Sequence, residues 1–116
     1  MNWLSRPMLE VFEAVDEPLL CTIRQSWGWS RRWQVYDADG RHVGAIRSPT
    51  IWFAFGKVLA TIQQSSDQSD IRFVRADGVE LGMLHLQGER TELEFTAEVD
   101  GEPFAKMLLL AAALVR

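Results

Sequence analysis

The stretch Pro103–Arg116, PFAKMLLLAAALVR, decides the fold. Its segment Met107–Val115 is an unbroken apolar run of residues that favour a helix. A helix that is apolar on every side is expected to be surrounded on every side. With a rise of about 1.5 Å per residue, it can thread a small domain but cannot span a bilayer. We therefore expect the preceding chain to wrap around this helix.

Two segments in the middle of the chain have the same pattern. Residues 33–46 read WQVYDADGRHVGAI, and residues 71–84 read IRFVRADGVELGML. Both contain Ala-Asp-Gly between alternating apolar residues, which predicts a tight hairpin because glycine accepts the positive φ of the turn. Both also contain a second glycine inside the next strand, which indicates a bulge or the close approach of another backbone. The terminal helix is the expected neighbour.

Weaker copies of this hairpin occur at residues 12–23, 52–62 and 95–107, where the second arm of the last copy becomes the helix. The copies share a small residue at the position of the second glycine. These small residues are Cys21, Gly44, Ala60, Gly82 and Ala105.

The fold class that follows is mainly β with one buried helix, in a single domain covering residues 1–116. We expect an antiparallel barrel or roll of about nine strands, closed or nearly closed around the C-terminal helix. Asp100 or Glu102 is expected to cap that helix, with Pro103 in its first turn. The predicted strands are 9–15, 18–25, 31–37, 41–47, 50–55, 57–64, 70–75, 79–86 and 91–99.

The charge is distributed unevenly along the chain. The net charge of −4 gives no overall basic footprint for nucleic acid, so we expect no nucleic-acid partner. Arginines dominate between Arg24 and Arg47, whereas the segment Asp67–Glu102 is acidic. A single cysteine, Cys21, excludes an internal disulfide. The start of the chain lacks the pattern of a signal peptide, and no transmembrane segment is predicted, so we expect a cytoplasmic location.

Residues 16–46, DEPLLCTIRQSWGWSRRWQVYDADGRHVGAI, resemble the opening of phospholipid scramblase-like proteins, in which a strand leads to a V-x-D-x-x-G-x-x-V-G-x-I hairpin. The segment 104–111, FAKMLLLA, is similar to the buried C-terminal helix of the same superfamily. That superfamily includes the phospholipid scramblases, the plant LURP-one-related proteins and the Tubby C-terminal domain. The resemblance implies an antiparallel β-barrel around a hydrophobic helix.

The chain also departs from that superfamily. It is shorter, and it lacks the proline-rich segment, the cysteine cluster for lipid attachment and the C-terminal membrane anchor of animal scramblases. Lipid transport is therefore not implied. The basic phosphoinositide pocket of Tubby domains cannot be matched residue by residue.

The segment 24–33, RQSWGWSRRW, contains the candidate ligand-binding residues. Indole rings favour the headgroup layer of a membrane, and arginines pair with phosphates. The alternative is that the tryptophans close one end of the barrel while the arginines are solvated. The candidate residues are Arg24, Trp27, Trp29, Arg31 and Arg32.

Other chemical signals are weaker. The run Asp37–Gly40 lacks the further oxygen ligands of a calcium loop and is explained by a turn. His42 and His85 are isolated, without nearby carboxylates spaced for zinc, and His85 is expected to be hydrogen-bonded and partly buried. Cys21 is expected to pack in the core. We find no catalytic signature and expect no cofactor and no metal.

Two functions follow from these observations. The first is a non-enzymatic binding module of the scramblase/Tubby-like type that contacts phospholipid headgroups or a protein partner through the Trp/Arg-rich segment. The second is a structural or interaction protein that forms a homodimer or larger homo-oligomer through an open strand edge. An enzyme with a small ligand in the barrel mouth is a remote third option.

Overall fold

A computed structural model describes residues 8–12, 19–26, 32–66, 69–88 and 90–115. The chain forms antiparallel strands, a short 3₁₀ turn η1 (Ala97–Val99) and the helix α1 (Pro103–Val115). The strands are β1 (Met8–Phe12), β2 (Leu19–Gln25), β3 (Trp33–Asp37), β4 (His42–Arg47), β5 (Thr50–Phe53), β6 (Val58–Gln64), β7 (Asp70–Val74), β8 (Glu80–Gln87) and β9 (Arg90–Phe95).

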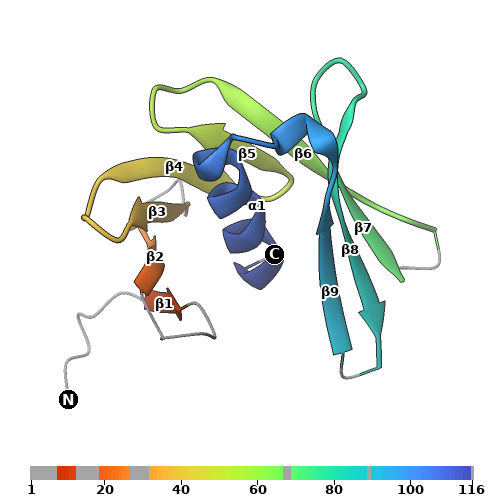
Figure 1. The fold of residues 1–116 in the computed structure, drawn as a ribbon, viewed down its shortest axis with the longest axis horizontal. Coiled ribbons are helices and arrows are strands. Elements are labelled where there is room, and N and C mark those ends of the chain that lie inside the picture. The colour runs from red at the N-terminus through yellow and green to blue at the C-terminus, as the bar shows by residue number, and fades with distance from the viewer. Residues whose placement is uncertain (1–7, 13–18, 27–31, 67–68, 89, 116) are drawn as a thin grey trace.

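The strands form one sheet, in which each strand pairs antiparallel with the next one in the chain, from β1 to β9. The sheet curls around α1 as a half-barrel (Figure 1). Within the described residues β1 and β9 do not pair, so the expected closure of the barrel is not observed. The coarser expectation, a mainly antiparallel β fold with one C-terminal helix, is confirmed.

One turn geometry recurs in three hairpins. The N–H groups of Gly40, Gly56 and Gly78 donate to the carbonyl oxygen three residues earlier, at 3.0, 2.9 and 2.9 Å. Their φ angles are +82°, +93° and +87°, a region that glycine occupies without steric cost. The glycine of each turn is therefore required by backbone conformation, as the repeated pattern predicts.

The same hairpins share a register shift just before the small residue. Val35 pairs with Gly44 and Tyr36 with His42, so Val43 has no partner in the ladder. Both Val43 and Gly44 are buried, because the bulge turns two consecutive residues toward the core. Register shifts also precede the other small residues in strands, Cys21, Ala60 and Gly82. The predicted bulge at the second glycine is confirmed.

The predicted close approach of α1 to the strand glycines is also observed. A Cβ atom at Gly44 would lie 2.7 Å from Leu108 Cδ2. At Gly82 it would lie 3.6 Å from Leu109 Cδ1. Consecutive leucines of α1 therefore contact the two equivalent glycines of the repeat.

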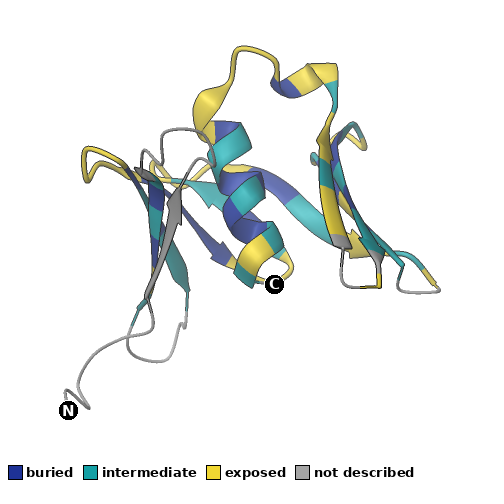
Figure 2. Ribbon diagram, turned by 60° about the horizontal axis from the view of Figure 1, so that its bottom comes forward, coloured by how far each residue is buried: buried dark blue, intermediate teal, exposed yellow. Residues whose placement is uncertain are grey.

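The prediction that α1 is surrounded on every side is wrong. Figure 2 shows buried positions on the part of α1 that faces the sheet and exposed positions at both ends of the helix. Phe104 and Leu114 are 43% and 53% exposed. The reason is that an open half-barrel covers a helix on one side only. The buried face consists of Ala105, Leu108, Leu109, Ala111 and Ala112. None of the helices that the structure describes combines the length and the apolar character needed to cross a membrane.

The predicted strand 91–99 is too long, because β9 ends at Phe95. Thr96 Oγ1 donates to the carbonyl oxygens of Glu80 and Leu81, at 2.7 and 3.2 Å. These bonds end the strand, and the 3₁₀ turn that follows places Val99 in the core. The N–H of Lys106 then donates to the carbonyl of Glu102 as α1 begins.

Candidate functional site

The side chains of β2 alternate between the core and the outer face of the sheet. Cys21 and Ile23 are fully buried, whereas Thr22 is partly exposed and Arg24 is exposed. The ladder places Tyr36 of β3 opposite Thr22. Because cross-strand neighbours point to the same face, these polar side chains lie together on the surface away from α1.

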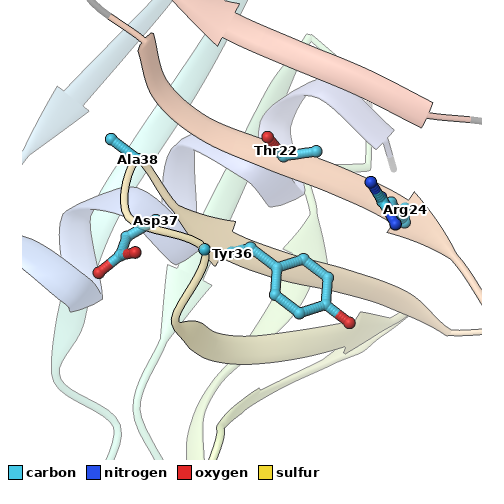
Figure 3. Close-up of a pocket in the computed structure, with 6 residues that line it drawn as sticks. Thr22, Arg24, Tyr36, Asp37 and Ala38 are labelled. Atoms are coloured by element: carbon cyan, nitrogen blue, oxygen red, sulfur yellow. The ribbon is translucent and has the colours of Figure 1, made fainter.

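A surface hollow of about 300 Å³ lies at this position, lined by Thr22, Arg24, Tyr36, Asp37, Ala38 and Gly40. Figure 3 shows Thr22 and Arg24 on one strand and Tyr36 on its neighbour, with α1 behind the sheet. The Tyr36 ring also lies 5.3 Å from the ring of His42, whose Nε2 is 2.7 Å from Gln34 Oε1. The hollow thus combines a cation, a phenol and a hydroxyl.

Asp37 lies at one edge of the hollow, and its carboxylate points away from Tyr36 and Arg24 (Figure 3). Its Oδ1 accepts from the backbone N–H groups of Arg41 and Asp39, at 2.8 and 3.0 Å. Its Oδ2 accepts from Arg41 Nε at 2.9 Å. These bonds, that from the Arg41 amide above all, hold the pKa of Asp37 below its usual range. The carboxylate is therefore occupied by the turn, and Arg24 has no ion-pair partner among the described residues.

Arg32 extends the same face toward β5. The ladder aligns Arg24 with Gln34, Gln34 with Ala45, and Ala45 with Trp52. The guanidinium carbon of Arg32 lies 4.8 Å from the centroid of the Trp52 ring, a cation–π contact. Its Nε is buried and has no hydrogen-bond acceptor within the described part of the chain.

The two ends of the predicted Trp/Arg-rich segment are joined. Ser26 N–H donates to the Arg32 carbonyl at 2.7 Å, and Arg32 N–H donates to Ser26 Oγ at 3.1 Å. Of the five predicted site residues, Arg24 and Arg32 are therefore placed by the structure. Trp27, Trp29 and Arg31 lie outside the described residues.

Two aromatic members of this face, Tyr36 and Trp52, were not predicted as site residues. Tyr36 joins Arg24 only because the ladder places Thr22 opposite it. Trp52 of β5 contacts Arg32, which directly precedes β3, although β4 lies between them in the sequence. The alternation of Val35 and Tyr36 along the strand indicates that Tyr36 lies on the outer face. It does not indicate which residue of β2 lies opposite Tyr36, because the sequence does not give the register between strands.

A second polar cluster surrounds His85. Its Nδ1 is 2.9 Å from Asp70 Oδ1, and its Nε2 is 3.6 Å from Glu94 Oε2. The expected hydrogen-bonded, partly buried histidine is confirmed. Strand pairing brings Asp70 and Glu94 beside it, which the spacing of these residues in the sequence does not predict. The hydrogen bond to Asp70, with the charges of both carboxylates, raises the pKa of His85.

Two other sequence expectations concern reactivity. Cys21 is fully buried, and this burial raises the pKa of its thiol, as expected for a packing residue. Among the residues that the structure describes, no group of three or more His, Cys, Asp or Glu side chains is placed to hold a metal ion.

Comparison with protein-family models, with curated proteins and with solved structures finds no match for this chain. The chemistry of the site therefore has to be inferred from its geometry. Arg24 is exposed beside Tyr36, Arg32 is partly buried against Trp52, and the carboxylate of Asp37 is paired with Arg41. This arrangement suits a ligand that carries phosphate or carboxylate groups.

Proposed function

We propose that this chain is a non-enzymatic binding module whose outer β2–β5 face contacts the phosphate headgroups of an anionic membrane. The observation that carries the proposal is the position of Arg24, which is exposed beside Tyr36 in a hollow. Among the described residues that line it, the one carboxylate, Asp37, is held by Arg41. Arginine pairs well with phosphate oxygens, and aromatic rings favour the interface between water and lipid.

The distribution of charge supports this orientation. Arg24 and Arg47 are exposed on the first half of the sheet, whereas Glu94 and Glu98 are exposed near its other end. Residues 19–53, which span β2 to β5, contain five arginines and two aspartates, so this segment would approach an anionic surface while the acidic segment 67–102 turns away from it. The net charge of −4 then does not prevent binding to an anionic membrane, because the attraction depends on the charges at the contact face.

We also propose that the module is of the scramblase/Tubby-like type. The support is the resemblance of residues 16–46 and 104–111, together with a curled antiparallel sheet that covers a C-terminal helix. The missing closure between β1 and β9 distinguishes this chain from a complete barrel.

The proposal is tested by flotation with vesicles of neutral lipid and with vesicles that also contain anionic lipid. Wild type should float only with the anionic vesicles, and less so as salt is raised. Arg24→Glu should lose most of this binding. Arg72 is an exposed arginine of β7 that pairs with Glu80 of β8. Arg72→Glu gives the same net charge as Arg24→Glu and should retain binding to anionic vesicles. Equal binding by both variants, or equal loss, would remove the proposal.

The contribution of the Trp/Arg-rich segment is measured separately. A variant carrying Trp27→Ala, Trp29→Ala, Arg31→Glu and Arg32→Glu should bind anionic vesicles more weakly than Arg24→Glu alone. Binding by this variant at the wild-type level would exclude the segment from the contact. If neither variant affects vesicles but both reduce capture of a protein from the host, the partner is a protein surface instead.

A second candidate function is self-association through the open edges of the sheet. The outer sides of β1 and β9 have no partner strand among the described residues, and such edges invite pairing with another chain. A homodimer is the expected product. Light scattering should give twice the monomer mass at high concentration and a lower mass on dilution, whereas a monomer at every concentration would exclude this candidate.

A further inference from the structure

A larger cavity, of about 530 Å³, lies where the β5–β6 and β7–β8 turns meet η1 and the start of α1. Figure 1 shows η1 and the chain that leads into α1 at the same end of the molecule as these turns. Its volume is in the range of small-molecule sites, about 300 to 1,000 Å³. The apolar side chains that line it include Phe53, Phe55, Val58, Leu81, Val99 and Phe104.

The cavity collects apolar surface that the fold leaves in water. Five large hydrophobic side chains are exposed among the described residues, and three of them line this cavity. They are Phe55, Phe104 and Val58, with exposed fractions of 76%, 43% and 41%. Removing apolar surface from water is favourable by about 25 cal/mol per Å², so a bound molecule that covers these side chains would gain binding free energy from the buried apolar area.

The aromatic rings give the cavity a preferred ligand shape. The rings of Phe53 and Phe55 are nearly parallel, at an angle of 7° with centroids 5.2 Å apart. Because Phe55 is mostly exposed, one of its faces remains open for a further flat ring to stack. An aliphatic chain would gain the apolar area but not this stacking.

The charged groups at the rim balance one another. Among the lining side chains, Arg75 lies 3.6 Å from Glu98, and it also pairs at 2.9 Å with Asp77, which lies outside the lining. The remaining rim charges are one cation, Lys57, and one carboxylate, Glu102. The rim therefore has no net charge with which to select a charged ligand, and its apolar lining dominates recognition.

We infer that this cavity is a binding site for a small, uncharged aromatic molecule, stacked on the exposed face of Phe55 and covered by Phe104. The site contains none of the residues proposed above for headgroup contact, so it is independent of that function. No covalent chemistry is involved.

The test is a fluorescence titration of the full chain with N-phenyl-1-naphthylamine, an uncharged probe with a naphthyl and a phenyl group. Wild type should bind it saturably. Phe55→Ala and Phe104→Ala should each weaken binding, by about three- to tenfold for the loss of an aromatic pair. Leu114→Ala removes an equally exposed apolar side chain at the other end of α1 and should leave binding unchanged. Absence of binding to wild type, or equal weakening by Leu114→Ala, would overturn the inference.

Two further measurements keep the inference separate from its rivals. Amide chemical shifts should change around residues 53–58 and 98–105 when the probe is added, and changes confined to other regions would overturn it. The anionic analogue 8-anilinonaphthalene-1-sulfonate should bind no more tightly than the uncharged probe, since tighter binding would indicate an electrostatic site. If Phe55→Ala instead halves the mass measured by light scattering, the occupant is a second copy of the chain and the inference is wrong.

Discussion

Hairpins β3–β4 and β7–β8 have the same turn and the same strand glycine, but the two glycines have different neighbours. A methyl group on Gly44 would overlap the carbonyl oxygen of Trp52 and press on Leu108. On Gly82 the nearest atom would be the carbonyl oxygen of Glu94 at 3.0 Å, with Leu109 at an ordinary contact distance. The shared sequence motif therefore fixes the turn and the bulge, while the curl of the sheet around α1 decides how much space remains.

The polar groups of the two hairpins differ in the same way. In β3–β4 the turn carboxylate of Asp37 is only 7% exposed and bonds to backbone and guanidinium N–H groups. In β7–β8 the position aligned with Asp37 is Arg75. The turn carboxylate there is Asp77, which aligns with Asp39, is 54% exposed and pairs with Arg75 at the surface. Surface ion pairs contribute little to stability, so the first turn is the more constrained of the two.

The largest expected effect tests whether the helix anchors both hairpins. Leu109 is fully buried beside the second hairpin, whereas Leu114 on the same helix is 53% exposed. Leu109→Asp places an unpaired charge in the core, at a cost on the order of 3–5 kcal/mol, and should unfold the domain. Leu114→Asp should fold normally. Circular dichroism with thermal melts measures both, and a native-like spectrum for Leu109→Asp would contradict the buried face of α1.

An intermediate effect separates the two glycines directly. Gly44→Ala should reduce the free energy of unfolding by about 1–3 kcal/mol or more, because the backbone carbonyl of Trp52 cannot move aside cheaply. Gly82→Ala should cost less than about 1 kcal/mol, since a small shift accommodates the methyl group and alanine lowers the entropy lost on folding. Urea denaturation gives both values. Equal losses would mean that the hairpins pack on α1 alike.

The smallest effect depends on pH and concerns the second hairpin. Protonated His85 can donate to both Asp70 and Glu94, and its pKa is raised above the ordinary value of 6.5. Its contribution to stability is therefore complete below about pH 6.5 and is lost as the pH rises through the raised pKa of the folded state. Melting temperatures of wild type should fall over this interval.

His85→Gln should flatten that fall, while His42→Gln on the first hairpin serves as the control and should preserve it. Glu92 lies opposite His85 in the ladder, so Glu92→Gln is measured as well to separate its charge from those of Asp70 and Glu94. If the melting temperature of His85→Gln depends on pH as that of wild type does, protonation of His85 does not cause the pH dependence.

Much of the fold could be predicted because its signals are local. The Asp-Gly turns need a positive φ, and the small residue in the next strand indicates a close neighbour. Gly40 therefore predicts the hairpin turn, and Gly44 predicts that another element packs against the hairpin. The apolar run that starts at Met107 predicts the helix. The open curl could not be predicted, because whether β1 pairs with β9 depends on the long-range curvature of the whole sheet.

The candidate site was predictable only in part. Arg24 and Arg32 stand out by composition, but their neighbours Tyr36 and Trp52 are set by register across several strands. Carboxylates near His85 were missed for the same reason, since Asp70 and Glu94 come from the two flanking strands. A one-residue change of register would place each of these side chains on the other face.

The central claim is that α1 lies in the concave side of the curled sheet, with consecutive leucines against equivalent glycines. The most direct measurement is a methyl NOESY spectrum of the folded protein. We predict cross-peaks from the Leu108 methyl groups to the Hα protons of Gly44, and weaker ones from Leu109 to Gly82. A spectrum in which the methyl groups of residues 108–112 contact only other helix residues would contradict the claim.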